Sequence, residues 1–310
     1  MEDFYVGIDV SKARLDVHVH PTGEVFDVTN DEAGVEELVS RLQVVAPALV
    51  VLEATGRQEV LAAAGLWAGG LPVAIVNAAQ VKSFALALNR RAKTDALDAQ
   101  VIARFAEAVK PAIRPLPDAE TAALEALVTR RRQVLRMRVG EQQRLQQTTD
   151  RPMRQSIKRM TEALTLELER LDDEIDKTIR ASPVWQVRED LMASVPGVGK
   201  LTARTLMAEM PELGSLSPKA VASLAGLAPF TRQSGQWKGK SFTGGGRAHV
   251  RSALFMAALS AARYNPTLAK TYKRMLDDGK PKMVAIIAVA RRLLTILNAI
   301  VRDHKPWKPA

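Results

Sequence analysis

Four carboxylates in the first hundred residues could bind metal ions. Asp9 lies in the middle of an apolar segment typical of a strand, where a carboxylate is costly unless it is paired or bound to a metal. Glu53 ends a second apolar run, and Asp95 and Asp98 are three residues apart on a predicted helix, so both point from one face. Carboxylate oxygens suit a hard cation such as Mg²⁺. Two such ions would activate an attacking oxygen and stabilise a leaving oxygen in phosphoryl transfer.

Each of these carboxylates also has an ordinary explanation. Asp9 alone could be a strand-edge carboxylate, and Asp95 could belong to the N-cap region of a helix. Asp98 could be a solvated helix charge and Glu53 a turn residue. Taken together these explanations weaken, because the order of the predicted strands favours convergence of the four side chains.

A serine in a basic, glycine-rich loop is the second candidate for chemistry. Ser234 is followed directly by glycine, and Ser241 lies seven residues later. The cations of this loop, which would stabilise charge developing on a phosphate, are Arg232, Lys238, Lys240 and Arg247. A serine beside glycine approaches a phosphodiester closely, but no histidine base is nearby, so activation would come from a metal or a composite site. From the chemistry alone, a flexible DNA-binding loop with an ordinary serine stays open, as does the choice between Ser234 and Ser241.

The charge distribution indicates a polyanionic partner. The net charge is +10, and residues 1–115 contain 11 Lys and Arg against 15 Asp and Glu, whereas the remaining residues contain 33 against 19. Residues 130–159 form the densest basic stretch. The arginines there that we expect to contact nucleic acid are Arg130, Arg131, Arg132, Arg136 and Arg138. A solvated helix face is the alternative, but such clustering favours phosphate neutralisation.

Two further segments suit phosphate groups. Gly197, Gly199 and Lys200 belong to a Pro-Gly-x-Gly turn before a predicted helix, where backbone N–H groups and the helix dipole favour an anion. This turn resembles a helix-hairpin-helix DNA contact, although a plain glycine-rich connection is the alternative. Arg247 and Arg251, four residues apart, share one helix face and are good phosphate ligands.

Hydrophobic periodicity predicts the elements that position these residues. Strands are predicted over residues 4–10, 15–19, 24–29, 48–52 and 71–76, and helices over residues 31–42, 58–68, 78–88 and 94–109. Three strands followed by alternating helices and strands imply an α/β domain at residues 1–115, with a mixed sheet covered by helices. Residues 116–183 predict an arm of two long antiparallel, coiled-coil-like helices. Residues 184–310 predict a mostly α-helical domain, with a loop from about Leu227 through Gly246.

Several classes of protein are disfavoured by composition. The chain has no cysteine and four histidines in no ligand-like cluster, which excludes disulfides, thiolate zinc sites and cysteine nucleophiles and disfavours a histidine zinc centre. No uninterrupted apolar run reaches the ~18 residues of a membrane helix, and no secretory signal is evident. We therefore expect a cytoplasmic protein.

Three motifs resemble the Asp-Glu-Asp-Asp tetrad of one transposase family. They are Gly-Ile-Asp-Val-Ser-Lys at residues 7–12, Leu-Glu-Ala-Thr-Gly at 52–56 and Lys-Thr-Asp-Ala-Leu-Asp-Ala at 93–99. Residues 194–200, 224–230 and 246–251 are similar to that family as well, so the resemblance covers nearly the whole chain in order. The family is the insertion-sequence DEDD/serine transposases, related to Piv-type DNA invertases and known as bridge-RNA-guided recombinases.

The resemblance implies a RuvC-like, RNase H-type first domain that holds Mg²⁺ through Asp9, Glu53, Asp95 and Asp98. It implies a C-terminal transposase domain whose Ser234 forms a covalent phosphoserine link to DNA, with Ser241 as the second choice. It further implies a tetramer of two dimers with composite active sites, and a structured noncoding bridge RNA that pairs with target and donor DNA. The same resemblance implies a bacterial, nucleoid-associated protein.

Other functions remain open from the residues. A junction-resolving or other RNase H-type metal nuclease would use the same tetrad without a serine, and a non-enzymatic nucleic-acid-binding protein would need only the basic arm. A sugar-kinase-type ATPase ranks far behind, because its later glycine motifs are not evident.

Overall fold

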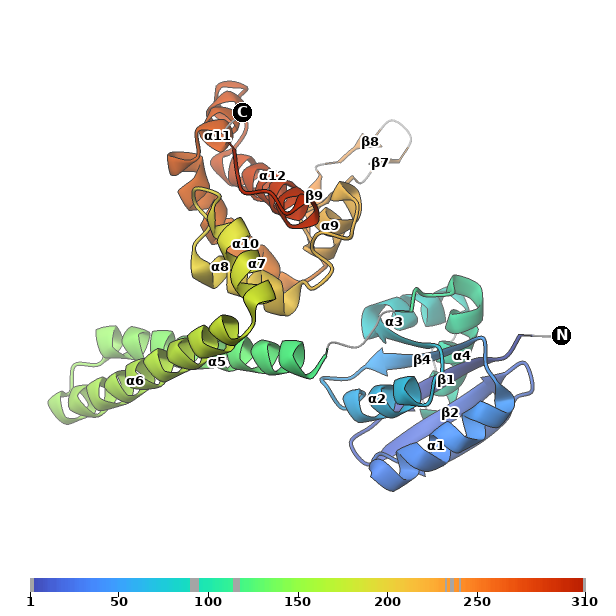
Figure 1. The fold of residues 1–310 in the computed structure, drawn as a ribbon. Coiled ribbons are helices and arrows are strands. Elements are labelled where there is room, and N and C mark those ends of the chain that lie inside the picture. The colour runs from blue at the N-terminus through green and yellow to red at the C-terminus, as the bar shows by residue number, and fades with distance from the viewer. Residues whose placement is uncertain are drawn as a thin grey trace. The chain divides into compact units, whose positions relative to one another are not determined.

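The structure is a computed structural model. It describes residues 3–89, 95–113, 118–231, 233–234, 237–239 and 241–308, with backbone only at 95, 96, 237 and 238. The chain divides into two compact units, Met1–Pro117 and Asp118–Ala310 (Figure 1). Each unit has its own core and is described by itself.

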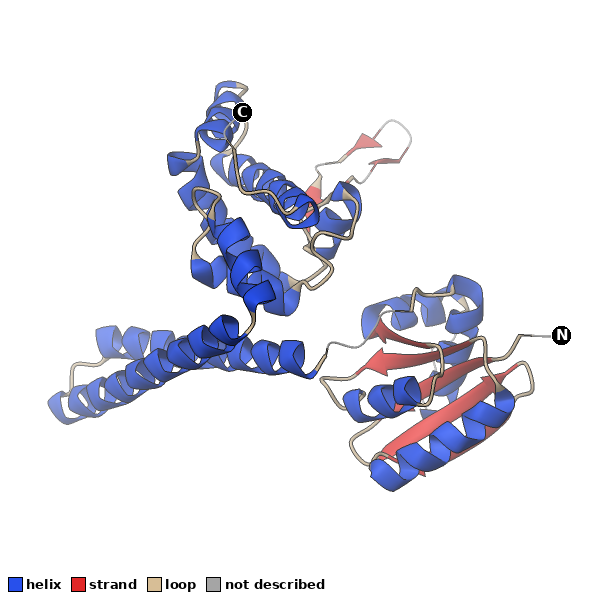
Figure 2. Cartoon of the chain, in the orientation of Figure 1, coloured by secondary structure: helices blue, strands red, loops and turns tan. Residues whose placement is uncertain are grey.

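The first unit is built on a five-stranded mixed sheet with the order β3-β2-β1-β4-β5 (Figure 2). The strands are β1 (Tyr5–Val10), β2 (Arg14–His20), β3 (Glu24–Thr29), β4 (Leu49–Ala54) and β5 (Val73–Asn77). β1 pairs antiparallel with β2 and parallel with β4, so it lies where the two kinds of pairing meet. The predicted mixed sheet is confirmed, because short β-branched runs bounded by turns identified all five strands.

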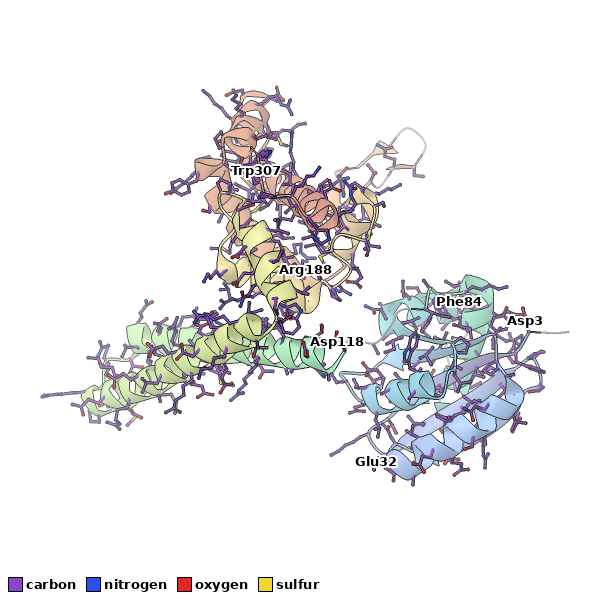
Figure 3. The ribbon with its side chains drawn as sticks, viewed as in Figure 1. Asp3, Glu32, Phe84, Asp118, Arg188 and Trp307 are labelled. Atoms are coloured by element: carbon purple, nitrogen blue, oxygen red, sulfur yellow. The ribbon has the colours of Figure 1, made fainter. Side chains whose placement is uncertain are left out.

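Helices cover both faces of this sheet. They are α1 (Glu32–Val45), α2 (Val60–Ala68), α3 (Ala78–Ala87) and α4 (Asp95–Val109). Side chains alternate along each strand, so Ile8 and Leu52 pack against α1 and α2, whereas Tyr5 and Val51 face α3 and α4. On the second face Phe84, labelled in Figure 3, packs edge to face with Phe105 of α4, with ring centroids 5.5 Å apart.

α4 crosses β1 in direct backbone contact. A Cβ atom at Gly7 would collide with the backbone of Ala99 and Ala103, so glycine is required there by close approach. Beyond the end of α4, Lys110 Nζ lies 5.6 Å from the ring centroid of Tyr5, at the beginning of β1. α4 therefore runs antiparallel to β1, and its first turn lies toward Asp9.

The second unit begins with two long helices, α5 (Ala119–Gln147) and α6 (Arg151–Ala181). Each starts after an aspartate whose side chain caps it, and proline follows in the first turn of α6, where it is tolerated. Half-way along, Val134 packs against Leu168 and Leu171. The two helices predicted from periodicity are confirmed as helices that pack on each other.

Six further helices complete the described part of the second unit. They are α7 (Pro183–Ala193), α8 (Lys200–Glu209), α9 (Pro218–Leu224), α10 (Ala248–Tyr264), α11 (Pro266–Asp277) and α12 (Lys282–Asp303). Their core includes Leu124 of α5 and Ile175 of α6, so the long helices are anchored in it. By length and composition α12 is apolar enough to span a membrane, but 56% of its apolar window is buried, as in the core helix of a soluble protein.

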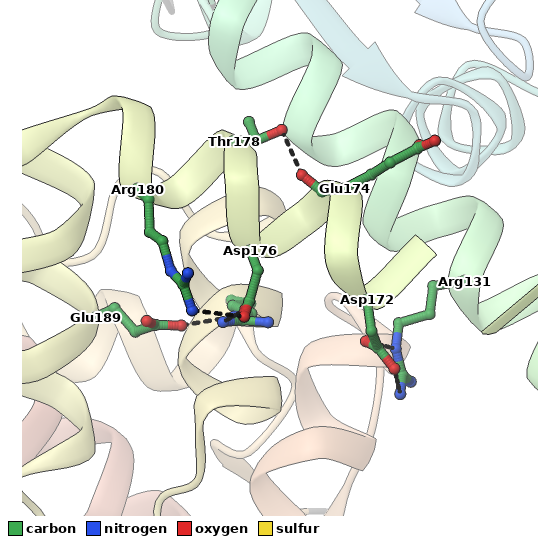
Figure 4. A network of polar contacts seen from close by, with 8 residues as sticks. Arg131, Asp172, Glu174, Asp176, Thr178, Arg180 and Glu189 are labelled. Carbon is green, nitrogen blue, oxygen red and sulfur yellow. Dashed lines mark hydrogen bonds and ion pairs between the residues drawn. The ribbon is translucent and has the colours of Figure 1, made fainter. Parts of the chain in front are cut away.

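A network of ion pairs joins α6, α7 and α8 (Figure 4). Arg204 is buried, donates to Glu189 at 2.5 Å and pairs with Asp176, which also accepts from Arg180 at 3.3 Å. The Arg204 hydrogen bond holds the pKa of Asp176 below its usual range. The network fixes the inner end of α6 against the helices that carry the Pro-Gly-x-Gly turn.

The segment between α9 and α10 corrects one prediction. A loop was expected there, but its described residues form four two-residue strands: β6 (Pro229–Phe230), β7 (Gln233–Ser234), β8 (Trp237–Lys238) and β9 (Phe242–Thr243). β6 pairs antiparallel with β9, and β7 pairs antiparallel with β8. Strands of two residues show no hydrophobic period, which is why the sequence indicated only a loop.

Candidate active site

Asp9 and Glu53 are brought to the same end of two adjacent strands. The parallel register of β1 and β4 runs up to Ile8 opposite Leu52, so Asp9 and Glu53 are the next residues along each strand. Ile8 and Leu52 face α1 and α2, which places Asp9 and Glu53 on the opposite face, under α4. Both carboxylates are half-buried.

The first turn of α4 brings Asp98 toward the same end of the sheet. Asp98 lies one turn before Ile102, which is buried against β1 and β4, and is itself half-buried. Asp95 is the first residue of α4, and its side chain is outside the described part of the structure. The three described carboxylates thus come from separate elements and lie at one edge.

The candidate ligands at this edge are carboxylates, whose oxygens a hard divalent cation prefers. Within the side chains that the structure describes, which exclude that of Asp95, no three Asp, Glu, His or Cys residues are close enough to hold one ion. Carboxylates suit Mg²⁺ in their chemistry, and β1, β4 and α4 bring them to one end of the sheet, but the described side chains do not form a complete ion site.

Asp16 is a neighbouring carboxylate that our sequence reasoning missed. It lies directly opposite Asp9 in the β1–β2 ladder and opposite Asp27 in the β2–β3 ladder, so the three aspartates form a row on one face. Like charges directly opposite destabilise a sheet, and Arg14 offsets them by pairing with both oxygens of Asp16 at 3.0 and 3.1 Å. The alternating pattern of residues 14–20 predicts a strand that contains Asp16. Placing Asp16 beside Asp9 also requires knowing how that strand pairs with β1.

Ser234 is exposed at the end of the β7–β8 hairpin, where it lies opposite Trp237. Ser241 is also exposed and directly precedes β9. The predicted contacts Arg232 and Lys240 lie outside the described residues, and Lys238 is described by its backbone alone. The hairpin therefore presents Ser234 to solvent, as a nucleophile that meets a large substrate requires.

Comparison with known proteins decides the family. Residues 6–152 match a family model described as transposase and named for the DEDD transposases of IS110, and residues 189–273 match one described as transposase of the IS116/IS110/IS902 family. The pilin gene-inverting proteins of Moraxella lacunata and Moraxella bovis are each 33% identical over 322 positions, covering 99% of this chain and 98% of theirs. The chain belongs to the IS110 family of transposases. A 43.6 kDa protein of insertion element IS110 from Streptomyces coelicolor is 32% identical over 136 residues, 43% of this chain and 32% of that protein.

This chain is therefore a DNA transposase or recombinase, and its substrate is DNA. The matched family implies a RuvC-like fold for the first unit and dependence on a divalent metal. The five-stranded mixed sheet with its acidic edge agrees with that fold.

Two of the arm arginines of the transposase are already paired inside the protein. Arg131 binds both oxygens of Asp172 at 2.6 and 2.9 Å, and Arg132 pairs with Glu209. Arg130 and Arg136 are exposed, and Arg138 is half-buried. Nucleic-acid contact by these five stays a prediction, and Arg130 and Arg136 are the most accessible of them.

The two arginines after the hairpin also have intramolecular contacts. Arg247 binds both oxygens of Glu212 at 2.5 and 2.7 Å, and Arg251 donates to the Gly245 carbonyl at 2.5 Å. In this structure the two arginines therefore hold the end of the segment that carries Ser234: Arg247 joins it to Glu212, and Arg251 binds its backbone at Gly245. To bind phosphate, either arginine would have to give up its intramolecular contact, and phosphate binding stays a prediction.

The Pro-Gly-x-Gly turn of the transposase is shaped by packing. Gly197 has a φ of 101°, and a Cβ there would lie 2.5 Å from the backbone nitrogen of Ala261 in α10. Gly199 is the N-cap of α8 and supplies no side-chain cap, and Lys200 is exposed. An uncapped helix start beside an exposed lysine agrees with the predicted phosphate contact without testing it.

Proposed function

We propose that this transposase cuts and rejoins DNA with Ser234 as nucleophile, assisted by Mg²⁺ bound to Asp9, Glu53, Asp95 and Asp98. The observation that carries the proposal is the strand register that makes Asp9 and Glu53 neighbours beneath the turn that carries Asp98. The fold thus brings carboxylates from three elements to one end of the sheet, and metal-assisted phosphoryl transfer would need them drawn together around the ion.

In the proposed step the Ser234 oxygen attacks the phosphorus of a DNA phosphodiester. A new O–P bond forms, one bond from phosphorus to a deoxyribose oxygen breaks, and the sugar oxygen leaves as a hydroxyl while the serine proton passes to solvent. Attack by a sugar hydroxyl of another strand reverses the step and releases the serine. A bound Mg²⁺ would supply Lewis-acid stabilisation of the phosphate charge. No water is consumed, so the strands are exchanged rather than hydrolysed.

We extend the proposal to the assembly. Several large apolar side chains on the long helices are more than 40% exposed: Met137, Val139, Met153, Met160 and Leu166. An exposed apolar set on paired helices supports a coiled-coil interface between copies, and from it a tetramer with composite active sites. The basic character of the same helices supports contact with a guiding bridge RNA. Like other enzymes that act on chromosomal DNA, the transposase is expected to be soluble and cytoplasmic.

A covalent adduct tests the nucleophile. The protein is expressed in bacteria with its flanking DNA, copurifying RNA is sequenced, and the complex is incubated with DNA carrying the inferred sites and Mg²⁺. A DNA–protein adduct is expected on a denaturing gel for the parent protein and for Ser241→Ala, but not for Ser234→Ala. Strand cleavage at the parent rate in Ser234→Ala, without an adduct, would instead identify a metal nuclease of the junction-resolving type. Unchanged recombination in Asp9→Asn would indicate a role in nucleic-acid binding alone.

A further inference from the structure

Two phenylalanines form an exposed aromatic pair at the base of the β7–β8 hairpin that carries Ser234, called the serine hairpin below. Phe230 and Phe242 are directly opposite each other in the β6–β9 ladder, with ring centroids 5.8 Å apart and ring planes 31° apart. Each of the two residues is 46% exposed. Opposite residues in a ladder share one face, so the two rings present a joint aromatic surface to solvent.

An apolar cavity of about 300 Å³ adjoins this aromatic pair. One wall is the hairpin base, including Phe242 and Thr243, and the other is the first three turns of α12. Met283 and Val284 on that wall are 62% and 49% exposed. A cavity lined in this way accepts a flat, apolar group that enters from solvent.

The charge around the cavity is positive. Among the described residues that line it, Arg291 carries the only charge. Lys280 and Lys282 stand just before the exposed wall of α12, and both are exposed. Aromatic faces with cations alongside are the combination that binds single-stranded nucleic acid, since bases stack on the rings while the cations follow the phosphates.

We propose that Phe230 and Phe242, with the adjoining cavity, hold an unstacked base of the DNA strand on which Ser234 acts. The inference rests on the proposed function for its link to the scissile phosphate. Ser234 is four positions after Phe230 in the chain, so their Cα atoms are at most about 14 Å apart. At a rise of about 3.4 Å per nucleotide, the base lies within about four positions of the phosphate that Ser234 attacks. Holding it out of the stack opens the duplex beside the cut, so that strands can be exchanged.

Single-strand binding tests the proposal independently of cleavage. All variants are made in the full-length Ser234→Ala protein, and the probe is a labelled strand of about 12 thymidines, within usual site sizes. Phe230→Leu with Phe242→Leu keeps apolar bulk but removes the rings, and affinity is expected to fall about tenfold with an unchanged salt slope. Arg291→Gln is expected to lower the slope by about 0.7, the loss of one phosphate contact. Tyr264→Leu, at a residue that is 70% exposed elsewhere on α10, is the matched control and should change nothing.

Two further measurements locate the base and separate the outcomes. On a strand of the same length without bases, the double leucine variant should bind as tightly as its parent. A strand carrying 5-iododeoxyuridine should photocrosslink to Phe230 or Phe242, as mapped by mass spectrometry.

Crosslinks elsewhere, or unchanged thymidine binding by the leucine variant, would overturn the base site without affecting a Ser234 adduct. A change in oligomeric state without loss of DNA affinity would assign the surface to a protein interface. An adduct that persists in Ser234→Ala would overturn the proposed nucleophile and leave the base site intact.

Discussion

The acidic edge of the first unit and the serine hairpin of the second are built in opposite ways. Asp9 and Glu53 are fixed by the register of a five-stranded sheet, and α4 is pressed on that sheet at Gly7. Ser234 lies on strands of two residues each, and no described residue hydrogen-bonds its side chain. The contrast teaches that the strands and the helix carrying the proposed metal ligands are fixed by their own fold. The proposed nucleophile has no such frame, so its substrate and the proposed assembly would complete its surroundings.

Stability should respond most strongly where the second unit buries charge. Arg204→Met removes the partner of the buried Glu189 carboxylate and is expected to lower the free energy of unfolding by about 3 to 5 kcal/mol. Arg180→Met is the control, because Arg180 is 72% exposed and its pair with Asp176 contributes no more than about 1 kcal/mol. Urea denaturation followed by hydrogen exchange would measure both effects and assign them to this unit. Equal losses in the two variants would contradict the buried-charge explanation.

Activity should respond most strongly at the acidic edge. Asp9→Asn keeps the size of the side chain but removes the charge, and strand cleavage is expected to fall by at least about 100-fold with stability retained. Asp27→Asn changes an exposed aspartate of the same row and should leave cleavage within about twofold of the parent. Cleavage rates measured against Mg²⁺ concentration provide the comparison. A similar loss in both variants would show that the row acts through its overall charge and not through Asp9.

The contact between α4 and β1 offers a milder perturbation. Gly7→Ala inserts a methyl group into the backbone of α4, so we expect a loss of about 1 to 3 kcal/mol and weaker Mg²⁺-dependent cleavage as Asp98 moves away. Gly140→Ala places the same methyl in open space on α5 and should stabilise by about 0.5 to 1 kcal/mol. Thermal unfolding measures both. A stable, fully active Gly7→Ala would show that the position of α4 is not critical.

The smallest expected effect is the pH dependence of stability that His249, in the first turn of α10, contributes. Burial and the positive charges of Arg132 and Arg136 lower the pKa of His249, while Glu209 opposes them. The unfolded chain therefore binds a proton at His249 at a pH where the folded chain does not, so stability falls as the pH drops below about 6.5. His249→Gln should remove this component, giving a smaller loss of stability between pH 7.5 and 5.5. Identical pH profiles for the two proteins would contradict the assignment.

Much of the fold could be predicted because hydrophobic period reports local structure. Alternation and short apolar runs identified the strands around Asp9 and Glu53, and proline at 152 marked the break between two long helices. The four short strands β6 to β9 were not predicted, because strands of two residues have no hydrophobic period. Asp16 was not predicted as a neighbour of Asp9, because that position depends on which strands pair.

The sequence by itself determined the elements, the motifs and the excess of positive charge in the second part of the chain. These follow from residue type and spacing, which act over a few neighbours. Only the tertiary structure decided that Asp9 and Glu53 are adjacent, that Arg131 and Arg247 are paired with carboxylates, and that two phenylalanines form one exposed surface. Each of these is a contact between segments distant in sequence, and such contacts are decided by strand order and packing rather than by local propensity.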